Sequence, residues 1–70
     1  MRLRELRNKS GYTQKKIANK LGVSGQTILN WENGIHEPNI NQLIQLADMF
    51  NVSVDYLIGR KSNEIRADEI

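Results

Sequence analysis

Residues 13–34 read TQKKIANKLGVSGQTILNWENG, and this stretch decides the fold because it holds two short helical patterns separated by one glycine-containing break. Thr13 is a favourable N-cap for the first pattern, and Gly22 can end it in a left-handed conformation. The apolar residues of this first pattern fall on one helix face, at Ile17, Ala18 and Leu21. The break that follows has room only for a tight turn.

The second pattern begins directly after the break. Ser24 can cap it, Ile28 and Trp31 share its inner face, and Gly34 supplies the stop. Its outer face carries Gln26, Leu29, Asn30 and Asn33. Two helices joined by so short a turn predict a helix-turn-helix, a geometry that is commonly used to read DNA.

Nine positions of this stretch also carry a family resemblance. They are Gln14, Ala18, Gly22, Val23, Ser24, Ile28, Trp31, Glu32 and Gly34. With them the chain resembles the Cro/CI-type (XRE) helix-turn-helix family of bacterial and phage repressors, over residues 3–58. The resemblance implies an all-α fold: a compact, five-helix, lambda-repressor-like DNA-binding domain in which helices 2 and 3 form the helix-turn-helix.

The flanking sequence predicts the three remaining helices. A short first helix ends near Gly11, and Tyr12 is expected to pack back as the chain turns. Asn39 and Gln42 form a capping box, which predicts a fourth helix up to Asn51. Val52–Gly59 then contains a fifth helix of one to two turns.

Charge is segregated along the chain, although the net charge is only +2. Residues 1–20 hold seven Lys or Arg and one acid, whereas residues 21–59 hold four acids and no Lys or Arg. Beside a helix-turn-helix, such a basic segment is expected to face phosphates rather than to be only a solvated surface. We therefore divide the chain into a DNA-binding domain, 1–59, and a charged C-terminal tail, 60–70. The tail either extends the fifth helix into a dimer interface or links to a further domain.

Length and composition exclude several classes of protein. Seventy residues make one small domain without a large pocket. The absence of cysteine removes disulfides and thiolate zinc sites, and no apolar run is long enough to cross a membrane. The N-terminus does not resemble a signal segment, so we expect a cytoplasmic protein, bacterial or phage-encoded, with no membrane partner.

Phosphate contacts are expected at the start of the second helix. Lys15 and Lys16 lie in its first turn, where cations oppose the helix dipole, and a DNA phosphate held by backbone N–H groups would offset that. By resemblance, Gln14 donates a further hydrogen bond to this phosphate. The alternative is that the two lysines are merely solvated.

A second expected phosphate contact lies in the loop after the third helix. Its donors are the backbone N–H groups of Asn33, Gly34 and Ile35. Related proteins often have Lys or Arg in this loop, whereas this chain has His36 and Glu37. The acidic Glu37 argues against a side-chain phosphate contact from this loop.

The outer face of the third helix is neutral, as base edges require. Gln and Asn can pair with adenine N6 and N7, and Thr and Leu can contact a thymine methyl. We call the four residues concerned the reading face: Gln26, Thr27, Leu29 and Asn30. Gly25 is a departure from the family, because a long polar side chain is common there, and one base contact is therefore missing.

Other prominent residues are assigned to structure. The resemblance implies an ion pair between Arg7 and Glu32 that joins the first and third helices, and Trp31 is expected in the core. His36 is the only histidine and there is no cysteine, so neither a zinc site nor a Cys–His pair is possible, and a Ser-His-Asp set would have to be built in a loop without a pocket. We expect no enzyme activity, no metal and no cofactor.

These observations favour a transcriptional regulator that binds double-stranded DNA sequence-specifically, as a repressor or Cro-like switch protein. The resemblance implies a homodimer on a palindromic operator. The alternative is a protein-interaction module of the same fold, an antirepressor or antitoxin whose main partner is another protein in a phage or toxin–antitoxin switch. The missing side chain at Gly25 and the acidic loop keep that alternative open.

Overall fold

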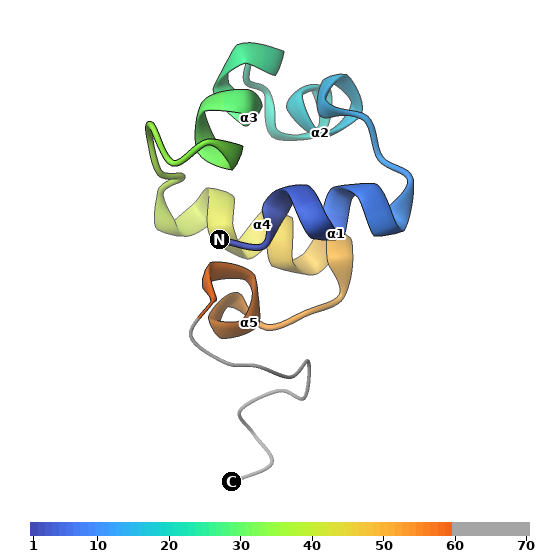
Figure 1. The fold of residues 1–70 in the computed structure, drawn as a ribbon, viewed down its shortest axis with the longest axis vertical. Helices are drawn as coiled ribbons and strands as arrows, with labels where there is room; N and C mark the ends of the chain where they lie inside the picture. The colour runs from blue at the N-terminus through green and yellow to red at the C-terminus, as the bar shows by residue number, and fades with distance from the viewer. Residues whose placement is uncertain (60–70) are drawn as a thin grey trace, which may run out of the picture.

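The computed structural model describes residues 1–59, and this part of the chain contains five helices. In chain order they are α1 (Leu3–Ser10), α2 (Gln14–Leu21), α3 (Gly25–Glu32), α4 (Ile40–Phe50) and α5 (Val54–Ile58) (Figure 1). No strand occurs in the described part, and the predicted all-α, five-helix class is confirmed. The predicted charged tail, residues 60–70, lies outside the described residues. None of the five helices is long and apolar enough to cross a membrane.

Side-chain caps explain where most of the helices begin. The capping oxygens belong to Thr13, Ser24, Asn39 and Ser53, and each accepts a hydrogen bond from the backbone N–H three residues later. At α4 the Gln42 side chain also accepts from the N–H of Asn39, so the predicted capping box is confirmed. Gly22, with a φ of 74°, makes the left-handed turn between α2 and α3, as predicted.

α3 ends where Gly34 was predicted to stop it. The helix ends at Glu32, Asn33 is its C-cap, and Gly34 follows directly. The N–H of Gly34 donates to the carbonyl of Trp31, three residues back, which tightens the chain before the left-handed Gly34 (φ 76°) redirects it. The loop therefore starts in a compact turn.

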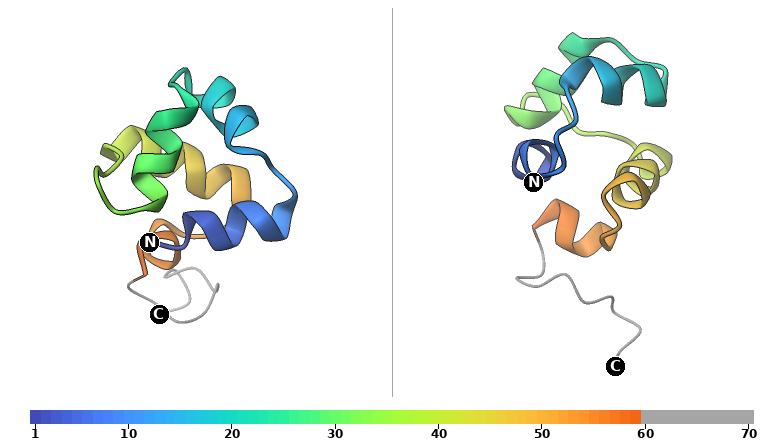
Figure 2. Two further views of the ribbon diagram at one scale, coloured as in Figure 1. Left: turned by 45° about the horizontal axis from the view of Figure 1, so that its top comes forward. Right: turned by 90° about the vertical axis from the view of Figure 1, so that its right-hand side faces the viewer.

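The helices enclose one small core. In Figure 1, α2 and α3 lie over α1 and α4, while α5 closes the opposite side, and the right-hand view of Figure 2 shows the same order. Buried apolar side chains from all five helices, and from the segment before α5, form this core: Leu3, Leu6, Ile17, Ala18, Ile28, Trp31, Leu46, Ala47, Phe50, Val52, Tyr56 and Leu57. Trp31 is only 4% exposed, so its predicted core position is confirmed. Tyr12 packs edge-on against Phe50, with ring centroids 5.8 Å apart.

One face of α4 is apolar yet exposed. Ile40 and Ile44 are 70% and 45% exposed, and they lie one turn apart on this helix. The core-facing side of α4 is instead formed by Leu46, Ala47 and Phe50. α4 therefore has two apolar faces. One packs into the core, and the other, with Ile40 and Ile44, is left uncovered by the described chain.

Candidate nucleic-acid interface

The outer side of α3 carries a hydrogen-bonded pair of amides. The Gln26 Nε2 donates to Asn30 Oδ1 at 3.0 Å, across one turn of the helix. This bond leaves the Gln26 Oε1 as an acceptor and N–H groups of Asn30 as donors. An adenine presents the complementary groups in the major groove, the N6 amino donor and the N7 acceptor. The pair is therefore chemically suited to an adenine edge.

The other two residues of the reading face are less free. The Thr27 Oγ1 lies 3.0 Å from Ser24 Oγ, so its hydroxyl belongs to the helix cap, and its methyl group is left for an apolar contact. Leu29 is half-buried. At about 100° per residue, Thr27 and Leu29 lie on opposite sides of the amide pair, at the two edges of the reading face.

Gly25 leaves an open space at the start of α3. A Cβ atom built on this residue meets no heavy atom within 4 Å, so no neighbouring side chain fills the position. The N–H groups of Gly25 and Gln26 donate to no other group in residues 1–59. The missing side chain is thus not replaced by another group of the described chain, and backbone donors are accessible in its place.

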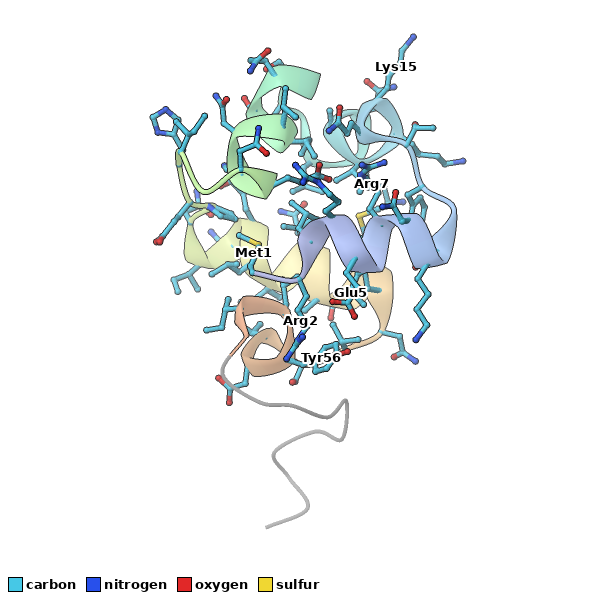
Figure 3. All side chains as sticks on the ribbon, viewed as in Figure 1. Met1, Arg2, Glu5, Arg7, Lys15 and Tyr56 are labelled. Atoms are coloured by element: carbon cyan, nitrogen blue, oxygen red, sulfur yellow. The ribbon has the colours of Figure 1, made fainter. Side chains whose placement is uncertain are left out.

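The start of α2 offers free donors next to two cations. Thr13 Oγ1 accepts from the N–H of Lys16, but within the described chain the N–H groups of Gln14 and Lys15 donate to nothing. The side chains of Lys15 and Lys16 are exposed, and Lys15 points away from the body of the domain (Figure 3). Asn19 and Lys20 line the same open hollow as these lysines. The arrangement is one that favours an anion.

A covered carboxylate joins α1, α2 and α3. The Glu32 side chain has no exposed surface, and its Oε2 lies 2.6 Å from Arg7 Nε. Its Oε1 accepts from Gln14 Nε2 at 3.0 Å and from Arg4 Nε at 3.4 Å. Figure 3 shows Arg7 reaching from α1 toward α2 and α3. The ion pair that the resemblance implied is therefore present, within a larger cluster.

Opposing effects act on the pKa of Glu32. Burial raises it, because the ionised form loses hydration. The hydrogen bonds from Arg7 and Gln14, the charge of Arg7 and the hydrogen bond from Arg4 outweigh burial, so the pKa lies below its ordinary value. Glu32 is consequently ionised in the folded protein at neutral pH.

Gln14 has a partner within the protein that the sequence did not predict. Its side-chain amide donates one N–H to Glu32, and the expected phosphate contact stays a prediction for the second N–H. A covered carboxylate accepts several hydrogen bonds, and the amide of Gln14 is a nearby donor on α2. The backbone N–H of Gln14 still faces the open start of α2.

The backbone N–H groups of the loop after α3 are hydrogen-bonded within the chain. The N–H groups of Asn33, Gly34 and Ile35 donate to the carbonyls of Leu29, Trp31 and Asn30, at 3.0, 3.2 and 2.9 Å. These N–H groups are used internally because the chain leaves α3 in a compact turn, and a phosphate contact by them stays a prediction. The side chains of Asn33, Ile35, His36 and Glu37 remain exposed at this end.

Arg4 is the residue that the sequence reasoning missed. Its Nη2 donates to Asn33 Oδ1 at 2.6 Å, which brings a cation to the end of α3. The signal was available: Arg4 lies three residues before Arg7, so the two side chains share one face of a helix. No group of three or more potential metal ligands occurs in residues 1–59.

The comparisons with known proteins agree with this geometry. The family described as Helix-turn-helix matches residues 3–57. The HTH-type transcriptional regulator ImmR of Bacillus subtilis (strain 168) is 42% identical over 67 residues, which cover 90% of this chain and 53% of that protein. AnsR, an HTH-type transcriptional regulator of the same organism, is 34% identical over 68 residues, which cover 97% of this chain and 59% of that protein.

A third relative is prophage-derived. YonR, an uncharacterized HTH-type transcriptional regulator of the SPbeta prophage in Bacillus subtilis (strain 168), is 33% identical over 69 residues, or 99% of this chain and 64% of that protein. This chain therefore spans between 53% and 64% of the length of these three relatives. No solved structure gave a significant match. Since the family match covers more than half of the chain, the protein belongs to the helix-turn-helix family of the Cro/CI (XRE) type.

Proposed function

We propose that this protein binds double-stranded DNA sequence-specifically by placing α3 in the major groove. The observation that carries the proposal is the outward-facing amide pair Gln26–Asn30 on a helix whose reading face bears no charge. The B-DNA major groove is about 12 Å wide and admits an α-helix. Free N–H groups and two lysines at the start of α2 support a phosphate contact beside it.

The proposed biological role is transcriptional regulation, as a repressor or Cro-like switch protein acting in the cytoplasm. The names of the relatives, HTH-type transcriptional regulators, support a role of this class. The prophage origin of YonR supports a switch of phage type. Helix-turn-helix regulators of this family are not enzymes, and we propose no catalytic role.

We further propose that the protein acts as a homodimer on a palindromic operator. The exposed Ile40–Ile44 face of α4 supports a protein contact, because apolar side chains of this size gain free energy when they are covered. A second copy is the simplest partner, since each half of a palindrome would then receive one α3. The same apolar face is the observation that favours the alternative, an antirepressor or antitoxin covered by a different protein.

Selection of duplexes from a random-sequence pool tests the DNA proposal. The 70-residue chain should enrich one sequence family, and a mobility shift should show tighter binding to the selected duplex than to a shuffled duplex of the same composition. A protein that folds but shifts neither duplex would contradict DNA binding and favour the protein-interaction alternative.

A further inference from the structure

The cation at the C-terminal end of α3 comes from α1. Arg4 spans the distance between the two helices, with its Nε 3.4 Å from Glu32 Oε1 and its Nη2 2.6 Å from Asn33 Oδ1. The Arg4 side chain is 53% exposed, whereas that of Glu32 is fully covered. The guanidinium is thus held at two points and still faces solvent.

The positive charge of Arg4 is not cancelled within this cluster. Glu32 is already paired with Arg7 at 2.6 Å, and it accepts from Gln14 as well. Two guanidinium groups and one carboxylate leave one positive charge over. A guanidinium has five N–H donors, and Nη1 of Arg4 donates to no group in residues 1–59. Arg4 therefore retains both charge and donors for an outside acceptor.

The position of Arg4 matters because the segment after α3 has few cations or free N–H donors that could bind an anion. Residues 33–59 contain no Lys or Arg, and Glu37 is acidic. The N–H groups of Asn33, Gly34 and Ile35 are bonded within the chain. A helix in the major groove has phosphate backbones on both sides, and the start of α2 supplies donors at only one of them.

We propose that Arg4, held by Asn33 and Glu32, binds a DNA phosphate beside the C-terminal end of α3. This inference rests on the proposed DNA binding. Related proteins often have Lys or Arg in the loop after α3, and Arg4 would take the place of those cations here. Planar guanidinium groups suit phosphate oxygens, because two parallel N–H donors can meet one phosphate. The competing role is a purely structural one, in which Arg4 only supports Glu32.

The test measures salt dependence with Arg4→Gln, which removes the charge and keeps a polar side chain next to Asn33. The matched control is Lys9→Gln on the same helix. Lys9 lies four residues after Glu5, on the side of α1 that carries Arg2 and Glu5, and Figure 3 shows these two residues beside α5 and away from α3. Both variants remove one positive charge from α1.

The probe is a fluorescein-labelled random-sequence duplex of about 20 base pairs, titrated with the 70-residue chain from about 50 to 200 mM KCl. Arg4→Gln should lower the slope of log K against log salt by about 0.9, the value for one phosphate contact on B-DNA. Lys9→Gln should keep the wild-type slope. Arg4→Lys keeps the charge, so it should also bind with the wild-type slope.

Each contrary result has a distinct meaning. An unchanged slope for Arg4→Gln, or an equal fall for Arg4→Gln and Lys9→Gln, would overturn the phosphate contact while leaving DNA binding intact. A slope for Arg4→Lys as low as that of Arg4→Gln would support a contact that needs the guanidinium held by Asn33 and Glu32, and not a positive charge alone. A wild-type chain without salt-dependent binding would overturn the proposed function itself.

Discussion

Gln26 and Asn30 are joined by a 3.0 Å hydrogen bond across one turn of α3, so each amide fixes the rotamer of the other. The bond costs one donor of Gln26 and one acceptor of Asn30, and it leaves one acceptor and several donors directed outward. The two residues therefore form one hydrogen-bonded unit of the proposed reading face, and we expect their substitutions to be coupled.

Gln26→Ala or Asn30→Ala should each weaken binding to the selected duplex by about 1 to 3 kcal/mol and relax the preference at one base pair per half-site. The double variant should lose less than the sum, because either single change also frees the remaining amide. Anisotropy titrations on the selected and shuffled duplexes measure this. Gln45→Ala, an exposed amide on α4, is the control. Equal losses on both duplexes would contradict base recognition by this pair.

The lysines at the start of α2 should control non-specific affinity. Lys15→Gln and Lys16→Gln should each lower the slope of log K against log salt by up to about 0.9, because each removes a cation beside the free N–H groups of this helix end. The preference for the selected duplex over the shuffled one should stay nearly constant. Wild-type slopes in both variants and in their double variant would mean that Lys15 and Lys16 do not contact phosphates.

Dimer formation should depend on the exposed apolar face of α4. Ile44→Glu places a charge beside Ile40, and it should weaken self-association and binding to a palindromic site more than binding to a single half-site. Because Ile44 is 45% exposed, the fold should persist. Sedimentation equilibrium measures the oligomeric state, and Gln45→Glu adds the same charge one position along the helix. If both variants associate like the wild type, a different surface joins the copies or no dimer forms.

Acid should remove the stability that the Glu32 cluster provides. The pKa of Glu32 is lowered in the folded protein by Arg7, Gln14 and Arg4, so the folded state favours the ionised form more than the unfolded chain does. This contribution is fully present above the pKa of an unfolded Glu, about 4.3, and is lost as the pH falls through the lower folded value. Urea unfolding from pH 7 to pH 3 should therefore show Glu32→Gln losing less stability than the wild type. Parallel curves would mean that Glu32 is not linked to this pH dependence.

The sequence predicts the helices well because local chemistry sets them. Thr13, Ser24 and Asn39 are capping residues whose hydrogen bonds involve only the next three residues. Gly22 can end α2 because glycine adopts a positive φ without steric cost. The apolar spacing around Ile28 then identifies the core face. These signals are all local, which is why they suffice without knowledge of the tertiary structure.

The site is predicted less completely because its details depend on contacts between distant segments. Gln14 turns to Glu32, eighteen residues away, and Arg4 reaches Asn33, twenty-nine residues away. The internal hydrogen bonds of Gly34 and Ile35 depend on how α3 ends, which the glycine alone does not specify. Residue type thus indicates the candidate surface, whereas the packing determines which donors on it stay free.

The last prediction concerns Arg7 and Glu32, whose 2.6 Å ion pair links α1 to the end of α3. Breaking a buried ion pair can cost about 3 to 5 kcal/mol, because the remaining charge stays unpaired and poorly hydrated. The Arg7 side chain is 17% exposed and Arg4 is a second partner for Glu32, so we expect Arg7→Ala to cost less than that range. Glu32→Ala leaves both arginines without their carboxylate partner. Either loss is large for a domain of this size.

A double-mutant cycle separates the pair from its surroundings. Thermal and urea unfolding of the wild type, Arg7→Ala, Glu32→Ala and the double variant should show the double variant less damaged than the sum of the single changes, since the second change removes the charge that the first left unpaired. DNA binding by Glu32→Ala should weaken through a displaced α3, even at temperatures where the variant is folded. Additivity within about 0.5 kcal/mol would mean that the two side chains act independently, and Glu32 would then act chiefly through Arg4 and Gln14.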